Sequence, residues 1–316
     1  MKFLAMDGIV VIDKPSGKTS YAVVADVRRL LGARKAGHTG TLDPLATGVL
    51  PVCINEATKL VQFFSPDSKE YRATMLLGVE TDTLDIEGKI IAECEPRVAR
   101  DEIEEVLHRF VGKIEQFPPR YSAVKFQGKP LYKWARRGIA VDLPPRTVEV
   151  YTIVVEEIVL PYVTFTVSCG SGTYIRSLCS DAGKMLGCGA CLASLRRTRS
   201  GCFHEELAVS IEGIDNEKKR DLLAANIVPL AEALPELPAI NVDQTLVEKL
   251  REGYQPDANA LGINRIPALA AGDMVRFMSP DHRLVAIGKM LCASEQIASL
   301  DGEKRVVKIM RVFNNW

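Results

Sequence analysis

Apolar residues recur at helical spacing in four separate stretches of the chain. The first stretch spans 20–31, with Ser20 as the expected N-cap and Gly32 as the stop. The second spans 103–111, and acidic residues lie in its first turn, where they favour the N-terminus of a helix. The remaining helices are predicted at 175–186, which Gly187 ends, and at 243–252.

Strand periodicity is clearest at 163–169, where apolar and polar residues alternate as they do in a half-buried strand. A turn is predicted at 170–174, directly before the third helix. Further strands are predicted at 71–78 and within the β-rich segment 148–160. Because strands mix with helices without regular βαβ repetition, we expect an α+β fold with a mixed or largely antiparallel sheet.

The last third of the chain has a different organisation. Pro229, Pro235 and Pro238 mark a linker, and after the fourth helix three short strands are predicted. These strands span about 273–278, 284–292 and 305–313. We therefore expect two domains, residues 1–235 and 236–316. The alternative is that the tail is an extra β subdomain that packs on the first domain and binds nothing.

Composition places the chain among ordinary globular proteins. Its 316 residues are 47% hydrophobic and 25% charged, which leaves room for two domains. No apolar run reaches transmembrane length and no signal-peptide pattern begins the chain, so a cytoplasmic protein is expected. The eight cysteines are then expected to be reduced core residues. A zinc site at Cys188 and Cys191 is the less favoured alternative, because no second pair lies at zinc-ribbon distance.

The distribution of charge matters more than the total. The net charge is zero, which argues mildly against nucleic acid as a partner. Residues 116–150, however, carry seven Lys or Arg against two acids, and residues 80–106 carry ten acids against three bases. Aromatic residues interleave with the cations of 116–150, a mixture that suits stacking on bases and contact with phosphates. This basic insert could otherwise be a solvated surface.

One carboxylate stands out in the loop 37–51, which reads GHTGTLDPLATGVLP. Asp43 is the only acid there, and His38 is the only other side chain that could carry charge. Pro44 stiffens the chain directly after the acid and restricts Asp43 itself to extended geometry. A lone acid on a stiff, weakly polar loop suits a nucleophile or a base as well as it suits a turn.

The loop resembles the catalytic-aspartate motif of the TruB family of tRNA pseudouridine synthases. Further pieces of the chain resemble other motifs of that family, occur in the family's order and extend over about residues 8–200. They are 8–20, 56–59, 69–71, 118–125, 172–176 and 195–197. Each piece alone is weak, but six of them in order are very specific. The tail resembles, more weakly, the small β-barrel-like PUA module that binds RNA.

The resemblance implies an isomerase that breaks the C1′–N1 bond of a uridine and joins C1′ to C5. That reaction involves no net redox change and no hydrolysis, so no cofactor or metal is required. Asp43 matches the nucleophile, and attack at C1′ or at C6 stays open. Arg176 matches the cation that keeps Asp43 charged, through a contact that could be bidentate. Tyr71 matches the tyrosine that stacks on the uracil, and Tyr174 and Leu195 match the pocket lining. Taken alone, these residues would be assigned to packing or to an exposed helix start.

A stacked uridine must be flipped out to react, and His38 matches the residue that fills the gap. Without the motif, His38 would be a turn residue. Lys14 and Pro15 are expected to support the loop of Asp43, and Lys59 to be structural or to touch phosphate. The cations expected on the RNA backbone are Lys129, Lys133, Arg136 and Arg137.

Three functions remain in view. The first is a stand-alone, bacterial-type enzyme acting on the T-arm of tRNA, at position 55 in standard tRNA numbering, as a monomer with no obligate protein partner and no membrane contact. The second is a guide-RNA-dependent relative of the dyskerin type. The third is a tRNA-folding chaperone without catalysis. The Leu-Ala-Thr-Gly-Val-Leu form of the loop and the long basic insert favour the first.

Overall fold

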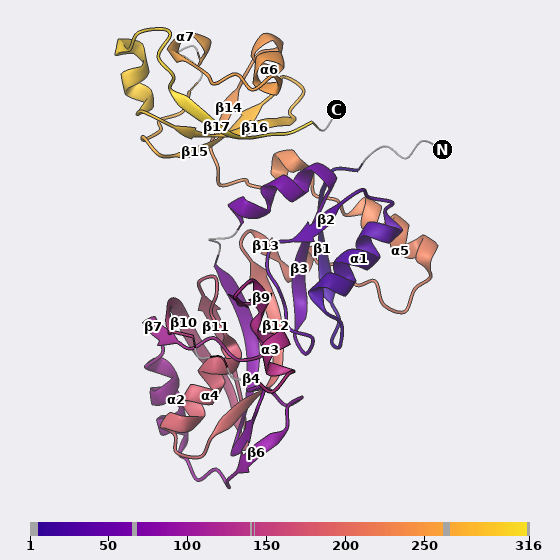
Figure 1. Cartoon of the computed structure of the whole chain (residues 1–316), viewed down its shortest axis with the longest axis vertical. Coiled ribbons are helices and arrows are strands. Elements are labelled where there is room, and N and C mark those ends of the chain that lie inside the picture. The colour runs from indigo at the N-terminus through magenta and orange to yellow at the C-terminus, as the bar shows by residue number, and fades with distance from the viewer. Residues whose placement is uncertain (1–5, 65–67, 140, 142, 262–265, 315–316) are drawn as a thin grey trace.

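A nine-stranded mixed sheet forms the centre of the molecule (Figure 1). A computed structural model describes residues 6–64, 68–139, 141, 143–261 and 266–314. The strand order is β1-β3-β12-β4-β11-β10-β7, with β2 beside β3 and β13 beside β12. The bounds are β1 Gly8–Lys14, β2 Ala36–His38, β3 Thr47–Ile54, β4 Lys69–Leu77, β7 Gly112–Gln116, β10 Arg146–Val159, β11 Tyr162–Cys169, β12 Ala190–Ser200 and β13 Phe203–His204. Every pairing is antiparallel except the short contact between β3 and β12, so the expected mixed sheet is confirmed.

Helices cover one face of this sheet. They are α1 Ser20–Leu30, α2 Arg100–His108 and α4 Ile175–Met185. Their apolar sides share a buried cluster with the sheet, in which Leu107 and Leu178 lie with Phe165. The second helix begins and ends three residues earlier than the expected 103–111, and its first turn carries the expected acids, Asp101 and Glu102. The side chain of Glu102 accepts a hydrogen bond from the backbone N–H of Ala99 at 2.7 Å, which closes the helix start.

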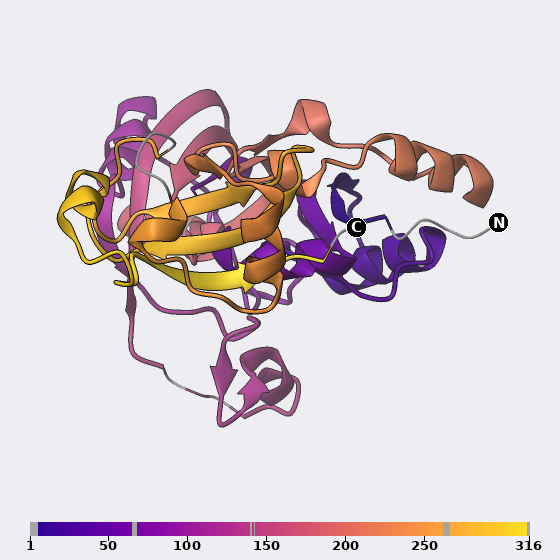
Figure 2. The ribbon, with the colours of Figure 1, turned by 90° about the horizontal axis from the view of Figure 1, so that it is seen from above.

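The basic insert is a separate lobe on the edge of the sheet. β7 and β10 pair antiparallel, with Gln116 opposite Arg146, so the chain leaves and re-enters the sheet at the same place. In between lie β8 Lys125–Phe126, β9 Lys129–Pro130 and the helix α3 Leu131–Ala135. Figure 2 shows these elements standing away from the rest of the molecule. The insert therefore projects from the sheet edge.

The C-terminal part has its own four-stranded sheet, in the order β14-β15-β16-β17. Its elements are β14 Ala239–Asn241, α6 Gln244–Arg251, α7 Ala258–Leu261, β15 Met274–Met278, β16 Leu284–Met290 and β17 Val307–Val312. Val247, Phe277 and Val285 belong to a buried cluster within this part. The strand pairings of the described residues form an open sheet rather than a closed barrel. The helix and three strands expected for the tail are therefore present.

The two parts meet in a shared apolar core. Phe64 and Phe203 from the first part lie in one buried cluster with Leu284 and Phe313 from the second. The segment 229–241, expected as a linker, is ordered into the 3-10 turn η3 Leu230–Glu232 and strand β14. Arg276 on β15 fixes this segment by donating to the carbonyls of Ala231 and Leu237 at 2.6 and 2.8 Å. The prolines thus mark a packed connection and not a free tether.

Other short elements complete the chain. They are the 3-10 helices η1 Asn55–Phe63, η2 Glu205–Leu207 and η5 Ser294–Ser299, the helix α5 Asn216–Ala225, and the two-stranded sheet of β5 Val79–Thr81 with β6 Ile90–Glu93. None of the eight cysteines, all of which lie in the described residues, forms a disulfide, and Cys188 and Cys191 are buried. None of the described helices is both long enough and apolar enough to cross a membrane.

Candidate active site

A cavity of about 360 Å³ opens between the loop of Asp43, the base of the lobe and the start of α4. Five of the residues selected from the sequence line it together: Asp43, Tyr71, Tyr174, Arg176 and Leu195. They come from the loop before β3, from β4, from the turn before α4, from α4 itself and from β12. The fold therefore gathers in one cavity residues that lie up to 152 positions apart, from 43 to 195.

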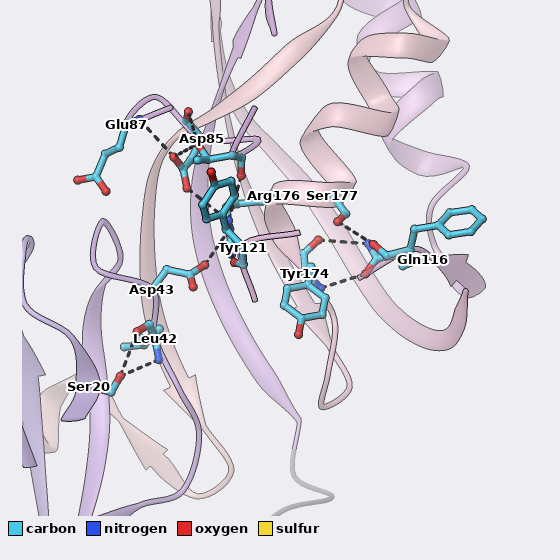
Figure 3. Close-up of polar contacts among 12 residues, drawn as sticks. Ser20, Leu42, Asp43, Asp85, Glu87, Gln116, Tyr121, Tyr174, Arg176 and Ser177 are labelled. Carbon is cyan, nitrogen blue, oxygen red and sulfur yellow. Dashed lines mark hydrogen bonds and ion pairs between the residues drawn. The ribbon is translucent and has the colours of Figure 1, made fainter. Parts of the chain in front are cut away.

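The floor of this cavity holds an ion pair between Asp43 and Arg176 (Figure 3). The Nε atom of Arg176 lies 2.9 Å from Oδ2 of Asp43, although its N–H is not aligned for a hydrogen bond. The other two guanidinium nitrogens donate to the carbonyls of Thr83 at 3.0 Å and Tyr121 at 2.9 Å. The short contact with the carboxylate is made through Nε, while the other two nitrogens donate to backbone carbonyls.

A second carboxylate, Asp85, lies behind Arg176. Its Oδ2 atom is 3.5 Å from Nη1 of Arg176, and the residue is buried. Its Oδ1 atom accepts hydrogen bonds from the hydroxyl of Thr83 at 2.6 Å and from the backbone N–H of Glu87 at 3.2 Å. Arg176 is itself only 4% exposed, so one buried cation serves two acids. The cluster carries a net negative charge when both acids are ionised.

Burial raises the pKa of Asp43 above its ordinary value of 3.8. The charge of Arg176 lowers this pKa, but the charge of Asp85 raises it again. The carboxylate is enclosed on most sides, while 36% of the side chain remains accessible through the cavity mouth. Asp43 is therefore a partly accessible acid whose charged form depends on Arg176.

Lys14 supports the loop of Asp43 from within the protein. It is fully buried, and its ammonium group donates to the carbonyls of Pro15 at 2.8 Å, Pro44 at 3.1 Å and Ala46 at 2.6 Å. Burial lowers the pKa of Lys14 to about 8, against the opposing effect of the Asp43 charge. Lys14 and Pro15 do not line the cavity. Their contacts therefore fix the backbone on both sides of the acid.

The helix side of the loop is held by Ser20. Its hydroxyl accepts from the backbone N–H of Leu42 at 2.8 Å and donates to the carbonyl of the same residue at 3.0 Å (Figure 3). Thr19, and not Ser20, caps α1, by accepting from the N–H of Ala22 at 3.1 Å. The expected N-cap is thus wrong by one residue, because Ser20 is already bonded to the residue before Asp43.

The aromatic walls are held in different ways. Tyr71 lies on a central strand between β11 and β12, and burial raises its pKa. Tyr174 is fixed by its backbone, which donates to the side chain of Gln116 at 3.0 Å and accepts from it at 3.2 Å (Figure 3). Leu195 is buried on β12. Together they make a partly apolar slot beside the carboxylate.

His38 and Lys59 lie outside the cavity lining. His38 is half-buried on β2, and burial lowers its pKa, as does the charge of Arg197. Lys59 lies where the two parts of the chain meet, because its ammonium group donates to Glu56 at 2.6 Å and to the carbonyl of Val312 at 2.8 Å. Of its two expected roles, these contacts favour the structural one.

The four cations selected on the lobe are exposed. The ammonium group of Lys129 lies 5.7 Å from the centre of the Trp134 ring, and the guanidinium of Arg136 lies 5.6 Å from that of Tyr132. No described acid lies within ion-pair distance of Lys129, Lys133, Arg136 or Arg137. Their charges are available to an anionic ligand.

Sequence reasoning missed four residues that shape the site: Asp85, Gln116, Ser122 and Arg197. Asp85 stood out only as part of an acidic stretch, and no local signal distinguishes it from its neighbours. Arg197 belongs to the motif at 195–197, so that motif could have indicated it. Among the described residues, no group of three or more His, Cys, Asp or Glu side chains could hold a metal ion.

This fold and this cavity define a pseudouridylate synthase catalytic domain followed by a PUA domain. Residues 28–175 match the family model described as TruB family pseudouridylate synthase (N terminal domain). Residues 176–235 match the tRNA pseudouridylate synthase B C-terminal domain, and residues 238–313 match the PUA domain. The chain belongs to the TruB family.

Known relatives extend over almost the whole chain. A protein of Syntrophus aciditrophicus named tRNA pseudouridine synthase B is 56% identical over 310 residues, which cover 98% of this chain and 99% of that protein. One of the same name from Geobacter sulfurreducens is 41% identical over 98% of this chain and 100% of that protein. Among solved structures, a chain of a Cbf5–Nop10–Gar1 complex is 33% identical with a TM-score of 0.71, covering 97% of this chain and 85% of that chain.

Proposed function

We propose that this protein isomerises the T-loop uridine of tRNA, at position 55 in standard tRNA numbering, to pseudouridine. The observation that carries the proposal is the pair of Asp43 and Arg176, with 2.9 Å between the carboxylate and the guanidinium, in a cavity walled by Tyr71, Tyr174 and Leu195. Relatives named tRNA pseudouridine synthase B, at 41–56% identity over 98% of the chain, support tRNA as the substrate.

Asp43 acts as the nucleophile in this proposal. Its carboxylate attacks C1′ of the ribose or C6 of the uracil, and the C1′–N1 bond breaks. C5 then bonds to C1′, the bond to Asp43 breaks again, and the proton lost from C5 is matched by one taken up at N1. Arg176 keeps the carboxylate ionised and aimed, since burial alone would favour the neutral acid. The isomerisation needs neither an oxidant nor water as a reactant, so the protein side chains supply the chemistry.

The cavity must receive a uridine that has left its stack. Tyr71 offers a ring to stack on the uracil, and Tyr174 and Leu195 close the sides of the slot. His38 lies at the start of the same loop, and in this proposal it fills the space that the flipped uridine leaves in the RNA stack. That position brings the loop of Asp43 next to the flipped nucleotide. The half-buried position of His38 means that it must turn outward when RNA binds.

The RNA contacts that support this chemistry are divided between two surfaces. The lobe offers Lys129, Lys133, Arg136 and Arg137 to the phosphate backbone. Residues 236–316 form the second RNA-binding domain, beside a catalytic domain at 1–235. The proposed enzyme works as a monomer without an obligate protein partner.

A guide-RNA-dependent reaction is the second candidate, because similar solved structures come from assemblies. One of them is the structure of an H/ACA RNP bound to a substrate RNA containing 2'-deoxyuridine, whose matching chain is 31% identical with a TM-score of 0.70. The higher identity, 56%, to a protein named tRNA pseudouridine synthase B favours the first candidate.

One experiment separates the candidates. The purified protein is incubated with an unmodified tRNA transcript, without metal, guide RNA or protein partner, and pseudouridine is mapped. Formation at position 55 alone is the expected result. Formation at another position would remove the T-loop assignment, and formation only with a guide RNA would favour the second candidate. Accelerated tRNA folding with no pseudouridine would leave a chaperone.

A further inference from the structure

Arg197 on β12 closes the loop of Asp43 at both ends. Its Nε atom donates to the carbonyl of Val49 at 2.7 Å, and its Nη2 atom donates to the carbonyl of Gly40 at 3.2 Å. The residue is 1% exposed, yet it is part of the cavity lining. One guanidinium therefore joins the two flanks of the loop and lies at the wall of the cavity.

The sequence is adapted to this close approach. Gly48 has a φ of +94°, and a Cβ added there would lie 2.3 Å from the carbonyl oxygen of Arg197. A Cβ at Gly40 would lie 3.4 Å from Nη1 of the same residue. Two glycines of the loop thus leave the room that Arg197 occupies.

The charge of Arg197 has no carboxylate partner in the described part of the chain. Its two hydrogen bonds to the backbone go to neutral carbonyls, and no described acid lies within 4.0 Å of its guanidinium. Arg176 differs, since it lies beside both Asp43 and Asp85. A buried cation without a counter-charge is costly, and backbone dipoles recover only part of that cost. The positive charge of Arg197 affects two neighbouring side chains. It lowers the pKa of His38, and it opposes the burial that raises the pKa of Tyr71.

A negative charge arises at this place only during the reaction. Whichever atom Asp43 attacks, the electron pair of the C1′–N1 bond leaves on the uracil ring, where N1 and the carbonyl oxygens share it. C5 then supplies the pair for the new bond to C1′, the carboxylate of Asp43 is released, and N1 takes up a proton as C5 loses one. A fixed donor that faces developing charge stabilises the transition state without reorganisation.

We propose that Arg197 is a catalytic residue that stabilises the uracil anion as the C1′–N1 bond breaks. The inference rests on the proposed function, and it assigns to the two arginines different tasks. Arg176 holds the nucleophile, and Arg197 holds the leaving group. The hydrogen bonds of Arg197 to the carbonyls of Gly40 and Val49 keep its guanidinium in position while the cavity is empty.

The leaving group itself provides the test. Fluorine at C5 withdraws electrons, so 5-fluorouracil leaves more easily and needs less stabilisation. Single-turnover loss of the original nucleoside is followed for a T-arm RNA with uridine or 5-fluorouridine at the target, by digestion and chromatography. Loss of the original nucleoside is the common readout, because 5-fluorouracil has no C5 proton to lose and cannot end as pseudouridine. For Arg197→Gln we expect a loss of about 100-fold to 1,000-fold with uridine. The loss with 5-fluorouridine should be at least tenfold smaller. Equal losses with both nucleotides would overturn the proposal and leave Arg197 as a support for the loop.

Arg196→Gln is the matched control. Arg196 precedes Arg197 on β12 and is bonded to Asp13 and Glu205 outside the cavity lining. We expect its rates to stay within about threefold of wild type with both nucleotides. A loss comparable to that of Arg197→Gln would overturn the assignment to Arg197.

A second measurement needs no variant and stands if Arg197→Gln does not fold. Free barbiturate is a uracil-like ring that is anionic at neutral pH, so it should inhibit the wild-type protein more strongly than free uracil. Equal or weaker inhibition would count against a cavity built for an anion. Failure of the proposed function looks different, since the wild-type protein would then convert neither nucleotide.

Discussion

The guanidinium of Arg176 lies 2.9 Å from the carboxylate of Asp43 and 3.5 Å from that of Asp85, and it binds two further backbone segments. One of these segments is the base of the basic lobe, at the carbonyl of Tyr121, and the other lies beside β5, at Thr83. The position of the nucleophile therefore depends on segments that are far apart in the sequence.

Replacement of Asp43 by Asn should abolish pseudouridine formation, with a loss of about 1,000-fold or more. The amide keeps the shape of the side chain and removes the nucleophile. Binding of tRNA and thermal unfolding should stay close to wild type, because Lys14 and Ser20 hold the loop and Arg176 keeps Asp85 as its counter-charge. Single-turnover mapping of pseudouridine measures this, and substantial remaining activity would remove Asp43 as nucleophile.

Replacement of Arg176 by Ala should remove most activity and also destabilise the fold. Loss of one partner from a buried ion pair leaves uncompensated charge, at a cost of about 3–5 kcal/mol. Arg176→Lys should recover only part of the activity, since an ammonium group lacks the planar fork that reaches Asp43, Thr83 and Tyr121 together. Rates and thermal melting are measured in parallel. A fully active Arg176→Lys variant would mean that Arg176 contributes only its positive charge and not its planar geometry.

Asp85→Asn should move the acid limb of kcat/KM to lower pH. The reaction needs ionised Asp43, whose pKa lies above 3.8 chiefly through burial, with Asp85 adding to the rise. Activity therefore falls as pH drops through this raised pKa. Removing the charge of Asp85 lowers the pKa of Asp43, so activity should persist at lower pH. The maximum rate can fall at the same time, because Arg176 loses one of its two carboxylate contacts. An unchanged acid limb would mean that another group titrates.

Much of this site was accessible from the sequence because the family's residues occur in recognisable short motifs. Asp85 was not, since its importance comes from its approach to Arg176, 91 positions later in the chain. For Lys59 the sequence left a structural role and a phosphate contact open, and only its tertiary bond to the carbonyl of Val312 favours the structural role. Periodicity predicted the helices α1, α2, α4 and α6 and six of the strands, but it did not reveal β1, β3, β12 or α5, and it did not fix the caps. Thr19 and Ser20 are both good caps, and only the tertiary bond of Ser20 to Leu42 decides between them.

Neutralising the lobe should weaken tRNA binding and flatten its salt dependence. The variant replaces Lys129, Lys133, Arg136 and Arg137 by Gln. Each cation that no longer pairs with a phosphate should reduce the slope of log K against log salt by about 0.7–0.9. The matched control replaces four exposed cations in and just after the acidic stretch, Lys89, Arg97, Arg100 and Arg109, and so changes the net charge equally. If the two variants bind alike, only total charge matters and the lobe is a solvated surface.

The C-terminal domain should contribute binding rather than chemistry. Its deletion is a poor test, because removal of residues 240–316 would expose Phe64 and Phe203, which are buried against Leu284 and Phe313. Surface substitutions are cleaner. Lys289 and Lys308 are exposed and lie directly opposite each other on β16 and β17.

Reversal of both charges to Glu should therefore raise KM for tRNA severalfold and leave the rate at saturating tRNA near wild type. Contacts far from the reacting uridine add the same binding energy to the ground state and the transition state. Arg97→Glu with Arg100→Glu provides the control for net charge. Steady-state kinetics on full-length tRNA measures both KM and the rate at saturating tRNA. An unchanged KM would mean that this face does not meet the substrate, and a lower saturating rate would mean that the domain helps to position the uridine over Asp43.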